Sequence, residues 1–307
     1  MPSLRQLRYF LAIADLQSFT AAAATLHVAQ PALTRHLASL EEELGTQLLA
    51  RTSRSVRLTE AGQRFRAKAR RLLEDLEFAC REAQAVGSGT LRYVRLAHSS
   101  SVPLAGLLGQ RLQAWLATHP TMHVEINQTT SENQIDDIAA GRSDLGLVRL
   151  PVLRRATGVT IQPILREALW AALPSGHPLA RGASIPLNAL AEQSFVFAPH
   201  PDRGGLSRAV FEVCQQAGFV PRCAQATSRK QSFLQLIALG LGVGLIPESM
   251  ALAAPPGVAT LPLAEAVWTD VALVYRTAPD DGPPLPDLSP WQAEASLNRV
   301  DPASTGP

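Results

Sequence analysis

The sequence predicts an α/β protein that begins with an all-α winged helix-turn-helix and continues into a larger two-lobed domain. Apolar residues recur at helical spacing through the N-terminal part, and predicted strands alternate with helices from Leu91 onward. A chain of 307 residues exceeds what one hydrophobic core usually serves. We expect the winged helix-turn-helix over 1–60, a linker helix and hinge over 61–90, the larger domain over 91–300 and a disordered tail over 301–307.

Composition excludes several classes of protein. The net charge is only +2, so any surface that binds nucleic acid has to be local. The chain shows no signal peptide and no run of about 20 apolar residues, which predicts a cytoplasmic protein with no membrane partner. Its three cysteines form no zinc pattern, and it has no nucleophile elbow or phosphate loop. We therefore expect no metal, no cofactor and no enzymatic activity.

Three short helices are expected at the N-terminus. Residues 4–14 place their apolar side chains on one face, and Ser18 caps a second helix over 19–26. A third helix starts near Gln30-Pro31, where a proline is tolerated, and ends at Gly45. Two short helices joined by a tight turn, the second with a polar face, describe a helix-turn-helix.

The polar face of the third helix carries candidate DNA contacts. Such helices enter the major groove by their N-terminal end, where Arg pairs with guanine and Gln with adenine. Two short strands, predicted over 48–52 and 56–59, form a wing in which Arg51 and Arg54 would neutralise phosphates, or Arg54 would enter the minor groove. The predicted DNA-binding residues are Gln30, Pro31, Thr34, Arg35, Ser39, Arg51 and Arg54.

The segment from Phe19 to Gly62 carries a longer pattern. Its elements are Ala22-Ala23, Gln30-Pro31-Ala32-Leu33, Leu40-Glu41, Leu44-Gly45 and Leu58-Thr59-Glu60-Ala61-Gly62. This run resembles the signature of the LysR-type transcriptional regulators almost position for position, with departures at Ala50, Ser53 and Ser55. Periodicity alone would equally suit an alanine-rich helical bundle with a solvated polar face. The resemblance favours the DNA-binding interpretation.

A long helix is expected from Thr59 to about Val86. About 25 residues span roughly 38 Å, a length that favours pairing with a second chain over a charged surface helix. The resemblance implies that this helix makes a homodimer, which effector domains extend to a homotetramer. A two-fold protein matches an interrupted dyad in double-stranded promoter DNA. RNA polymerase is a further candidate partner.

Two similar halves are expected in the larger domain, one near 91–161 with 266–300 and one near 162–265. The resemblance implies a periplasmic-binding-protein-like effector domain that holds its ligand between these lobes. Hydroxyls and glycines at helix starts suit an anion, although a serine there also simply caps its helix. We therefore expect a small organic anion, a carboxylate, as effector. The predicted effector-binding residues are Ser99, Ser100, Ser101, Ser131, Gly204, Gly205, Leu206 and Ser228.

Two alternatives stay open. Cys214 and Cys223 are nine residues apart, a spacing similar to that of the peroxide-sensing branch of the family, although only Cys214 aligns with a sensor cysteine. This would make the protein a redox-sensing regulator. The other alternative is a solute-binding or enzymatic module fused to a helix-turn-helix.

Overall fold

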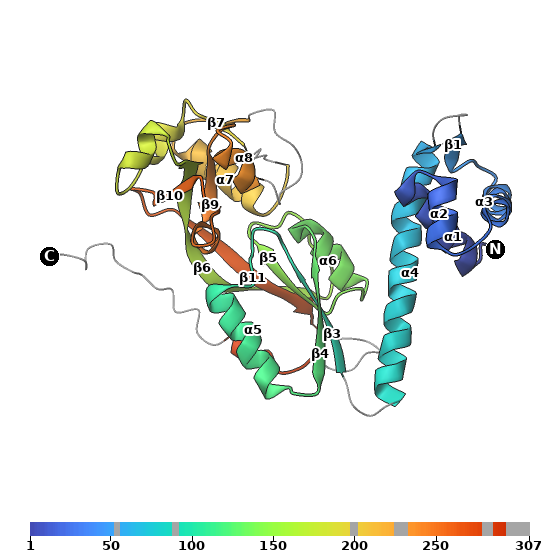
Figure 1. Ribbon diagram of the computed structural model, residues 1–307. Helices are drawn as coiled ribbons and strands as arrows, with labels where there is room; N and C mark the ends of the chain where they lie inside the picture. The colour runs from blue at the N-terminus through green and yellow to red at the C-terminus, as the bar shows by residue number, and fades with distance from the viewer. Residues whose placement is uncertain (52–55, 88–91, 197–201, 224–232, 278–284, 293–307) are drawn as a thin grey trace. The chain divides into compact units, whose positions relative to one another are not determined.

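The computed structural model describes residues 1–51, 56–87, 92–196, 202–223, 233–277 and 285–292 (Figure 1). The chain divides into two compact units, Met1–Thr90 and Leu91–Pro307. Within the described ranges, no helix combines the length and apolar character needed to cross a membrane. Residues 88–90 of the predicted linker and hinge region (61–90) and the predicted tail at 301–307 lie outside the described residues.

The first unit is a winged helix-turn-helix followed by one long helix, as predicted. Its elements are α1 (Leu4–Leu16), α2 (Phe19–Thr25), α3 (Gln30–Leu44), β1 (Leu49–Arg51), β2 (Val56–Leu58) and α4 (Glu60–Gly87). Ser3 and Ser18 cap α1 and α2 through their hydroxyls, and Gly45 ends α3 in the left-handed conformation at φ 64°. Phe10 and Leu37 are among the fully buried residues of the shared core.

Close packing joins α4 to the wing and to α1. A Cβ on Gly62 would overlap the carbonyl oxygen of Leu48, so only glycine lets the first turn of α4 approach the wing this closely. Farther along α4, Arg66 and Arg70 both bind the Asp15 carboxylate of α1, with N–O distances of 2.6 and 2.5 Å. The long helix is therefore fixed to the head at two levels.

The second unit is built on a seven-stranded sheet in the order β10-β6-β11-β5-β3-β4, with β9 also paired to β6. We call residues 92–168 and 268–292 the first lobe, because β6 pairs with β11 over this part of its length. Its elements are β3 (Arg92–His98), α5 (Gly106–Thr118), β4 (Met122–Gln128), α6 (Ser131–Ala139), β5 (Leu145–Arg149), the start of β6 (Val159–Pro174), β11 (Trp268–Arg276) and α10 (Ser289–Gln292).

Residues 169–267 form the second lobe, in which the end of β6 pairs with β9 and β10. Its elements are the 3-10 turns Pro178–Arg181 and Leu187–Leu190, then β7 (Ser194–Phe195), α7 (Leu206–Gln216), β8 (Arg222–Cys223), α8 (Phe233–Ala238), β9 (Gly244–Pro247), α9 (Glu248–Ala251) and β10 (Val258–Pro262). The split predicted at 161/162 therefore falls inside one continuous strand, where no turn residue marks a boundary.

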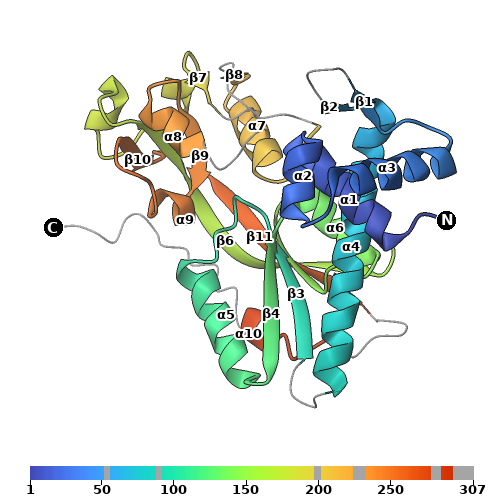
Figure 2. The same cartoon turned by 45° about the vertical axis from the view of Figure 1, so that its right-hand side comes forward.

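Strand alternation assigns helices to the two faces of each sheet. In the first lobe, Leu273 packs toward α5 whereas its neighbour Val274 packs toward α6. In the second lobe, Ala171 faces α7 and Ala172 faces α8. Figures 1 and 2 show the resulting layers, with helices on both sides of the strands. This arrangement confirms the predicted α/β class with two lobes.

Candidate functional sites

The N-terminal half of α3 presents the predicted DNA-contacting side chains unequally. Gln30, Pro31 and Arg35 are exposed. The Thr20 hydroxyl of α2 donates to Gln30 Oε1 at 3.2 Å, so the helix before α3 orients the glutamine. Sequence reasoning missed Thr20, and its spacing of ten residues from Gln30 gives no periodic signal.

Two other predicted residues make internal contacts. The Thr34 hydroxyl donates to the backbone oxygen of Gln30 at 3.1 Å. Ser39 faces α1, where its Oγ accepts from Gln6 Nε2 at 3.2 Å. Gln6 also donates to Glu43 and completes the capping box with Ser3. Ser39 is therefore half-buried in a helix-helix contact, unlike the exposed Arg35.

The wing is positioned by the end of α3. Glu41 Oε1 accepts from the backbone N–H groups of Leu48 and Leu49, at 2.8 and 3.0 Å. The backbone of Arg51 pairs with Val56 in the antiparallel β1–β2 ladder. Arg54 lies outside the described residues.

The predicted serine run in the second unit forms a turn, which corrects one expectation. Val102 N donates to Ser99 O at 2.9 Å, and α5 begins only at Gly106, so these serines do not open the helix. Ser99 and Ser101 are buried and their hydroxyls lie 3.2 Å apart, whereas Ser100 is half-buried. The turn gathers two hydroxyls beyond the carboxyl end of β3.

Ser131 behaves differently from a capping serine. Thr130 caps α6 by accepting from Asn133 N at 3.2 Å, which leaves the Ser131 hydroxyl for another role. That hydroxyl accepts from Arg149 N at 3.4 Å and is buried. The simple capping explanation for this serine is therefore wrong.

Of the predicted residues at the start of α7, the two glycines lie at the boundary between the lobes, whereas Leu206 lies in the core of the second lobe. Gly205 caps α7 with its backbone and donates from its N–H to Pro151 O of the first lobe at 2.8 Å. Gly204 lies beside Glu132, and Leu206 packs into the core of the second lobe. Leu206 therefore does not present its side chain to a ligand. Ser228 lies outside the described residues.

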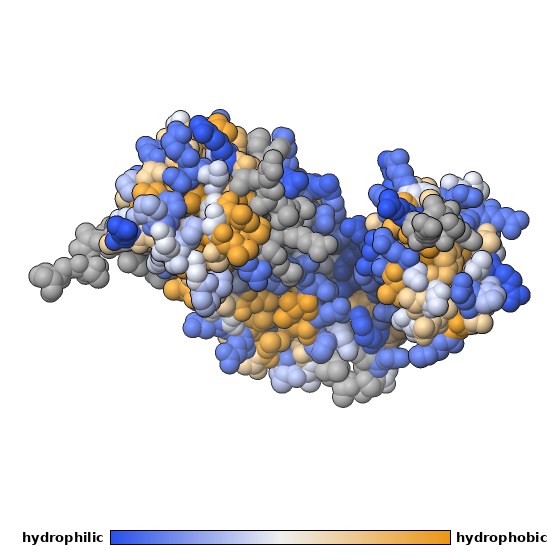
Figure 3. Space-filling view, turned by 45° about the horizontal axis from the view of Figure 1, so that its top comes forward, coloured by the Kyte–Doolittle hydropathy of each residue, from blue (hydrophilic) through white to orange (hydrophobic). Residues whose placement is uncertain are grey.

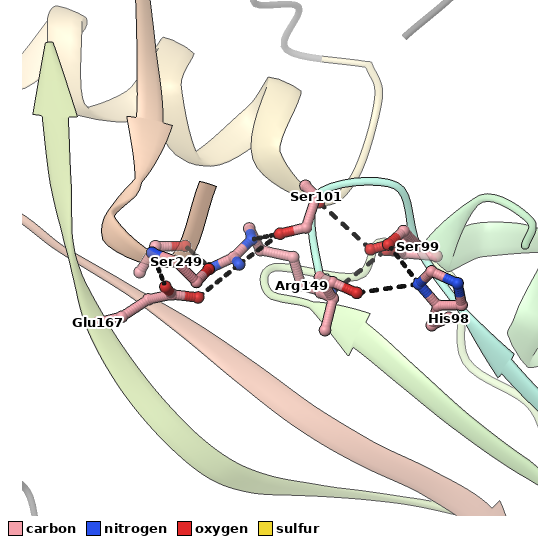
Figure 4. Close-up of polar contacts among 9 residues, drawn as sticks. His98, Ser99, Ser101, Arg149, Glu167 and Ser249 are labelled. Atoms are coloured by element: carbon pink, nitrogen blue, oxygen red, sulfur yellow. Dashed lines mark hydrogen bonds and ion pairs between the residues drawn. The ribbon is translucent and has the colours of Figure 1, made fainter. Parts of the chain in front are cut away.

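A buried arginine links these elements and was missed by sequence reasoning. Arg149 is fully buried, and its guanidinium donates to Ser101 O, Glu167 Oε1 and Thr269 Oγ1. Figure 4 shows these contacts running from the turn after β3 to Glu167, whose other oxygen accepts from Ser249 N at 3.0 Å. The available signal was a charged residue that ends the otherwise apolar run of β5.

Electrostatics explain why this arginine has an acidic partner. Burial lowers the pKa of Arg149, and the Glu167 carboxylate, 2.6 Å away, counteracts that shift. A buried guanidinium without such a partner would be strongly destabilising. Arg149 and Glu167 therefore neutralise each other where β5, β6 and β11 meet. Neither charge is left without a partner that a ligand would have to supply.

The environment of Cys214 does not favour a redox-reactive thiol that could pair with Cys223. This thiol is fully buried in the core of the second lobe, and burial raises its pKa to about 12. It therefore stays protonated at neutral pH, while the nucleophilic form is the thiolate. Cys223 is exposed in β8. In the described residues, no cluster of His, Cys, Asp or Glu could hold a metal ion.

Both units match known families and solved structures. A model described as the LysR substrate binding domain matches residues 87–288, and one described as a bacterial regulatory helix-turn-helix protein of the lysR family matches 4–63. The HTH-type transcriptional regulator XapR of Escherichia coli (strain K12) is 33% identical over 276 residues, 89% of this chain and 92% of XapR.

Similarity to solved structures extends over nearly the whole chain. The crystal structure of CbnR, a LysR family transcriptional regulator, has a TM-score of 0.75 at 28% identity and covers 94% of this chain and 96% of CbnR. Full-length CbnR complexed with its target DNA gives a TM-score of 0.74 at the same identity and coverage.

Proposed function

Because this chain belongs to the LysR family of bacterial helix-turn-helix transcriptional regulators, we propose that it binds promoter DNA through α3 and the wing and that a small organic carboxylate alters this binding. It acts in the cytoplasm, as a dimer on an interrupted dyad, without catalysing a reaction. Effector domains would join two dimers into a tetramer.

The exposed N-terminal half of α3 carries the DNA-binding proposal. Arg35 and Gln30 are exposed there, and Thr20 holds the glutamine in place. These are side chains that pair with guanine and adenine in the major groove. The structure of CbnR with its target DNA supports this assignment by similarity.

Replacing Arg35 by alanine tests base reading. We expect a loss of about 1–3 kcal/mol at one base position and a relaxed preference there. Footprinting on fragmented genomic DNA identifies the site, and fluorescence anisotropy with single-base variants measures the preference. Arg222→Ala, which removes an exposed arginine from the second unit, is the control. An Arg35→Ala protein with unchanged base preference would refute the role.

The dimer proposal depends on one face of α4. Leu72 and Leu76 are 59% and 36% exposed on it, although they are large and apolar. Near the start of α4, a groove of about 700 Å³ is lined by apolar residues that include Phe65 and by cations of α4 that include Lys68 and Arg71. Acidic residues follow from Glu74 onward. An antiparallel pair of α4 helices therefore places basic halves beside acidic halves.

The effector proposal depends on buried hydroxyls of the first lobe. Ser99 and Ser101 lie together, and Ser131 is freed from capping by Thr130. Hydroxyls and the start of α6 are suited to hold a carboxylate through neutral donors. Arg149 is already paired with Glu167, so it would not bind the carboxylate itself. Its hydrogen bond to Ser101 O would instead fix the turn that carries the serines.

Calorimetric titration with benzoate and succinate, each beside its neutral amide, tests the ligand class. We expect binding of a carboxylate, a preference over the amide, and roughly tenfold weaker binding in Ser131→Ala, the loss of about one hydrogen bond. Ser184→Ala, at an exposed position of the second lobe, is the control. Heat with an amide and none with any carboxylate would overturn the assignment.

A further inference from the structure

The start of α7 in the second lobe lies directly against the first lobe. The Gly205 N–H donates to Pro151 O at 2.8 Å, which links the two lobes by a backbone hydrogen bond. A Cβ on Gly205 would lie 3.2 Å from Ser131 Oγ and 3.7 Å from Arg149 O. Two segments of the first lobe, the start of α6 and residues 149–151, therefore contact this one glycine.

Both glycines are needed for this approach, for different reasons. Gly205 has φ 71° and ψ −149°, a conformation that essentially only glycine adopts without strain. Gly204 carries no positive φ, but a Cβ there would overlap Glu132 Oε1 and lie 3.1 Å from Pro151 O. A side chain at either position would push the lobes apart or displace their contacts.

The Glu132 carboxylate is held in place from the other side. Its Oε1 accepts from Leu153 N and its Oε2 from Arg154 N, both at 2.9 Å. Charge-assisted bonds to backbone N–H groups are stronger than neutral ones, so this carboxylate moves away only at a cost. The surface that meets Gly204 is thus a fixed part of the first lobe.

We infer that Gly204, Gly205 and Glu132 are positioning residues that hold the two lobes in contact beside Ser131, and that they set how readily the domain reaches its effector-binding state. Only the effect on effector binding rests on the proposed function; the contact between the lobes does not. Loosening the contact reduces the population that binds effector and so weakens the apparent affinity by the same factor. The sequence-based assignment of both glycines as effector ligands is replaced by this role.

The test measures the distance between the lobes in the full-length chain without added effector. Spin labels are attached to Gln113→Cys on α5 and Asn188→Cys in the second lobe, both exposed positions. The exposed native cysteines are replaced in the same background by Cys80→Ser and Cys223→Ser. Pulsed electron–electron double resonance then gives the distribution of interlobe distances for each variant.

Each test variant has a matched control in the same lobe. Gly204→Ala is compared with Gly176→Ala, where a Cβ meets open space and φ is not positive. Gly205→Ala is compared with Gly218→Ala, at the other end of α7, where φ is 89° and space is again open. We expect both test variants to broaden the distribution and shift it to longer distances, and both controls to match the parent.

A double variant separates the specific contact from general damage. Because Glu132→Ala removes the group that a Cβ at position 204 would strike, adding Gly204→Ala to it should lengthen the distance less than Gly204→Ala does alone. Distributions for Gly204→Ala and Gly205→Ala that coincide with their controls would overturn the inference. The readout needs no effector, so failure of the carboxylate proposal would leave it standing.

Discussion

At the scale of single residues, Gly62 decides how closely α4 can approach the wing. The space for its Cβ is occupied by the Leu48 carbonyl, a backbone group held in place by the hydrogen bond that Thr59 N donates to it. Neither the helix nor the strand can yield without breaking other contacts. A methyl group at this position is therefore more disruptive than its size suggests.

Gly62→Ala should lower the free energy of unfolding by about 1–3 kcal/mol, because overpacking forces the backbone to shift. Urea unfolding followed by circular dichroism measures the loss. Gly87→Ala is the matched control on the same helix, since a Cβ at Gly87 has no neighbour within 4 Å. Equal stability of the two variants would contradict the proposed clash.

Individual residues could be singled out from the sequence only where a local pattern marked them. Ser131 and Gly205 were singled out as candidates because hydroxyls and glycines at helix starts stand out in an alternating pattern, and the structure places both of them at the contact between the lobes. Arg149 was missed because a charged residue at a strand end usually reaches solvent, and its partner Glu167 is 18 positions away. Leu206 was misassigned because its position beside Gly205 does not reveal that it turns into the core.

At the scale of elements, α4 separates its charges along its length. Basic residues dominate between Arg64 and Arg71, and acidic ones follow between Glu74 and Glu77. A parallel pair would oppose like charges, whereas an antiparallel pair of equal overlap brings Arg71 of one chain near Asp75 of the other. The charge pattern thus selects orientation as well as partner.

Arg71→Glu should weaken the dimer, and adding Asp75→Arg should restore it, because the pair is then exchanged and its attraction kept. Sedimentation velocity over a range of protein concentrations measures the association. Arg5→Glu changes an exposed arginine of α1 and serves as the control. Dimers of unaltered strength in the single variant would show that α4 pairs in another way.

Element bounds were predictable where particular residues mark the ends of a helix. The third helix was predicted to start near Gln30-Pro31 and to end at Gly45, and α3 spans Gln30–Leu44 with Gly45 as its C-cap. The boundary between the lobes was not, because β6 passes through it as 16 residues of unbroken strand. Pairing with β11 and then with β9 and β10 creates that boundary, and these partners are distant in sequence.

At the scale of the whole molecule, the charge is divided between the units. Residues 1–90 hold 12 of the 28 arginines and lysines and 9 of the 26 acidic residues, so the small positive net charge of the chain resides there. The second unit carries a slight negative excess. A nearly neutral protein therefore has a basic first unit, which favours contact with the phosphates of DNA.

This division predicts that salt weakens DNA binding much more than it affects carboxylate binding. Between about 50 and 200 mM salt, DNA affinity should fall by roughly tenfold or more, because phosphate contacts release counterions. Carboxylate affinity should change by less than about twofold, since neutral donors in a buried site are little screened. Anisotropy and calorimetry at matched salt concentrations give both slopes. A steep slope for the carboxylate would indicate that a free cation binds it.

On the face shown in Figure 3, apolar side chains gather in several patches with hydrophilic side chains between them, and both units carry such patches. Leu239 and Leu252 of the second lobe are 74% and 79% exposed. Exposed apolar residues are common on folded proteins. We therefore base the proposed function on the exposed side chains of α3 and on the buried hydroxyls of the first lobe, and not on apolar exposure.

The place of β11 in the sheet has a consequence for how the protein is made. This strand lies between β6 and β5, yet it is the last along the chain of the strands that the structure describes, and it pairs Val271 with Arg149 and Leu165. During synthesis on the ribosome, the sheet of the first lobe therefore lacks β11 between β5 and β6 until residue 276 has emerged. By then all the described strands of the second lobe have been made. Nascent chains are then exposed longest at the edges of β5 and β6, where a chaperone or a second nascent chain would compete with β11.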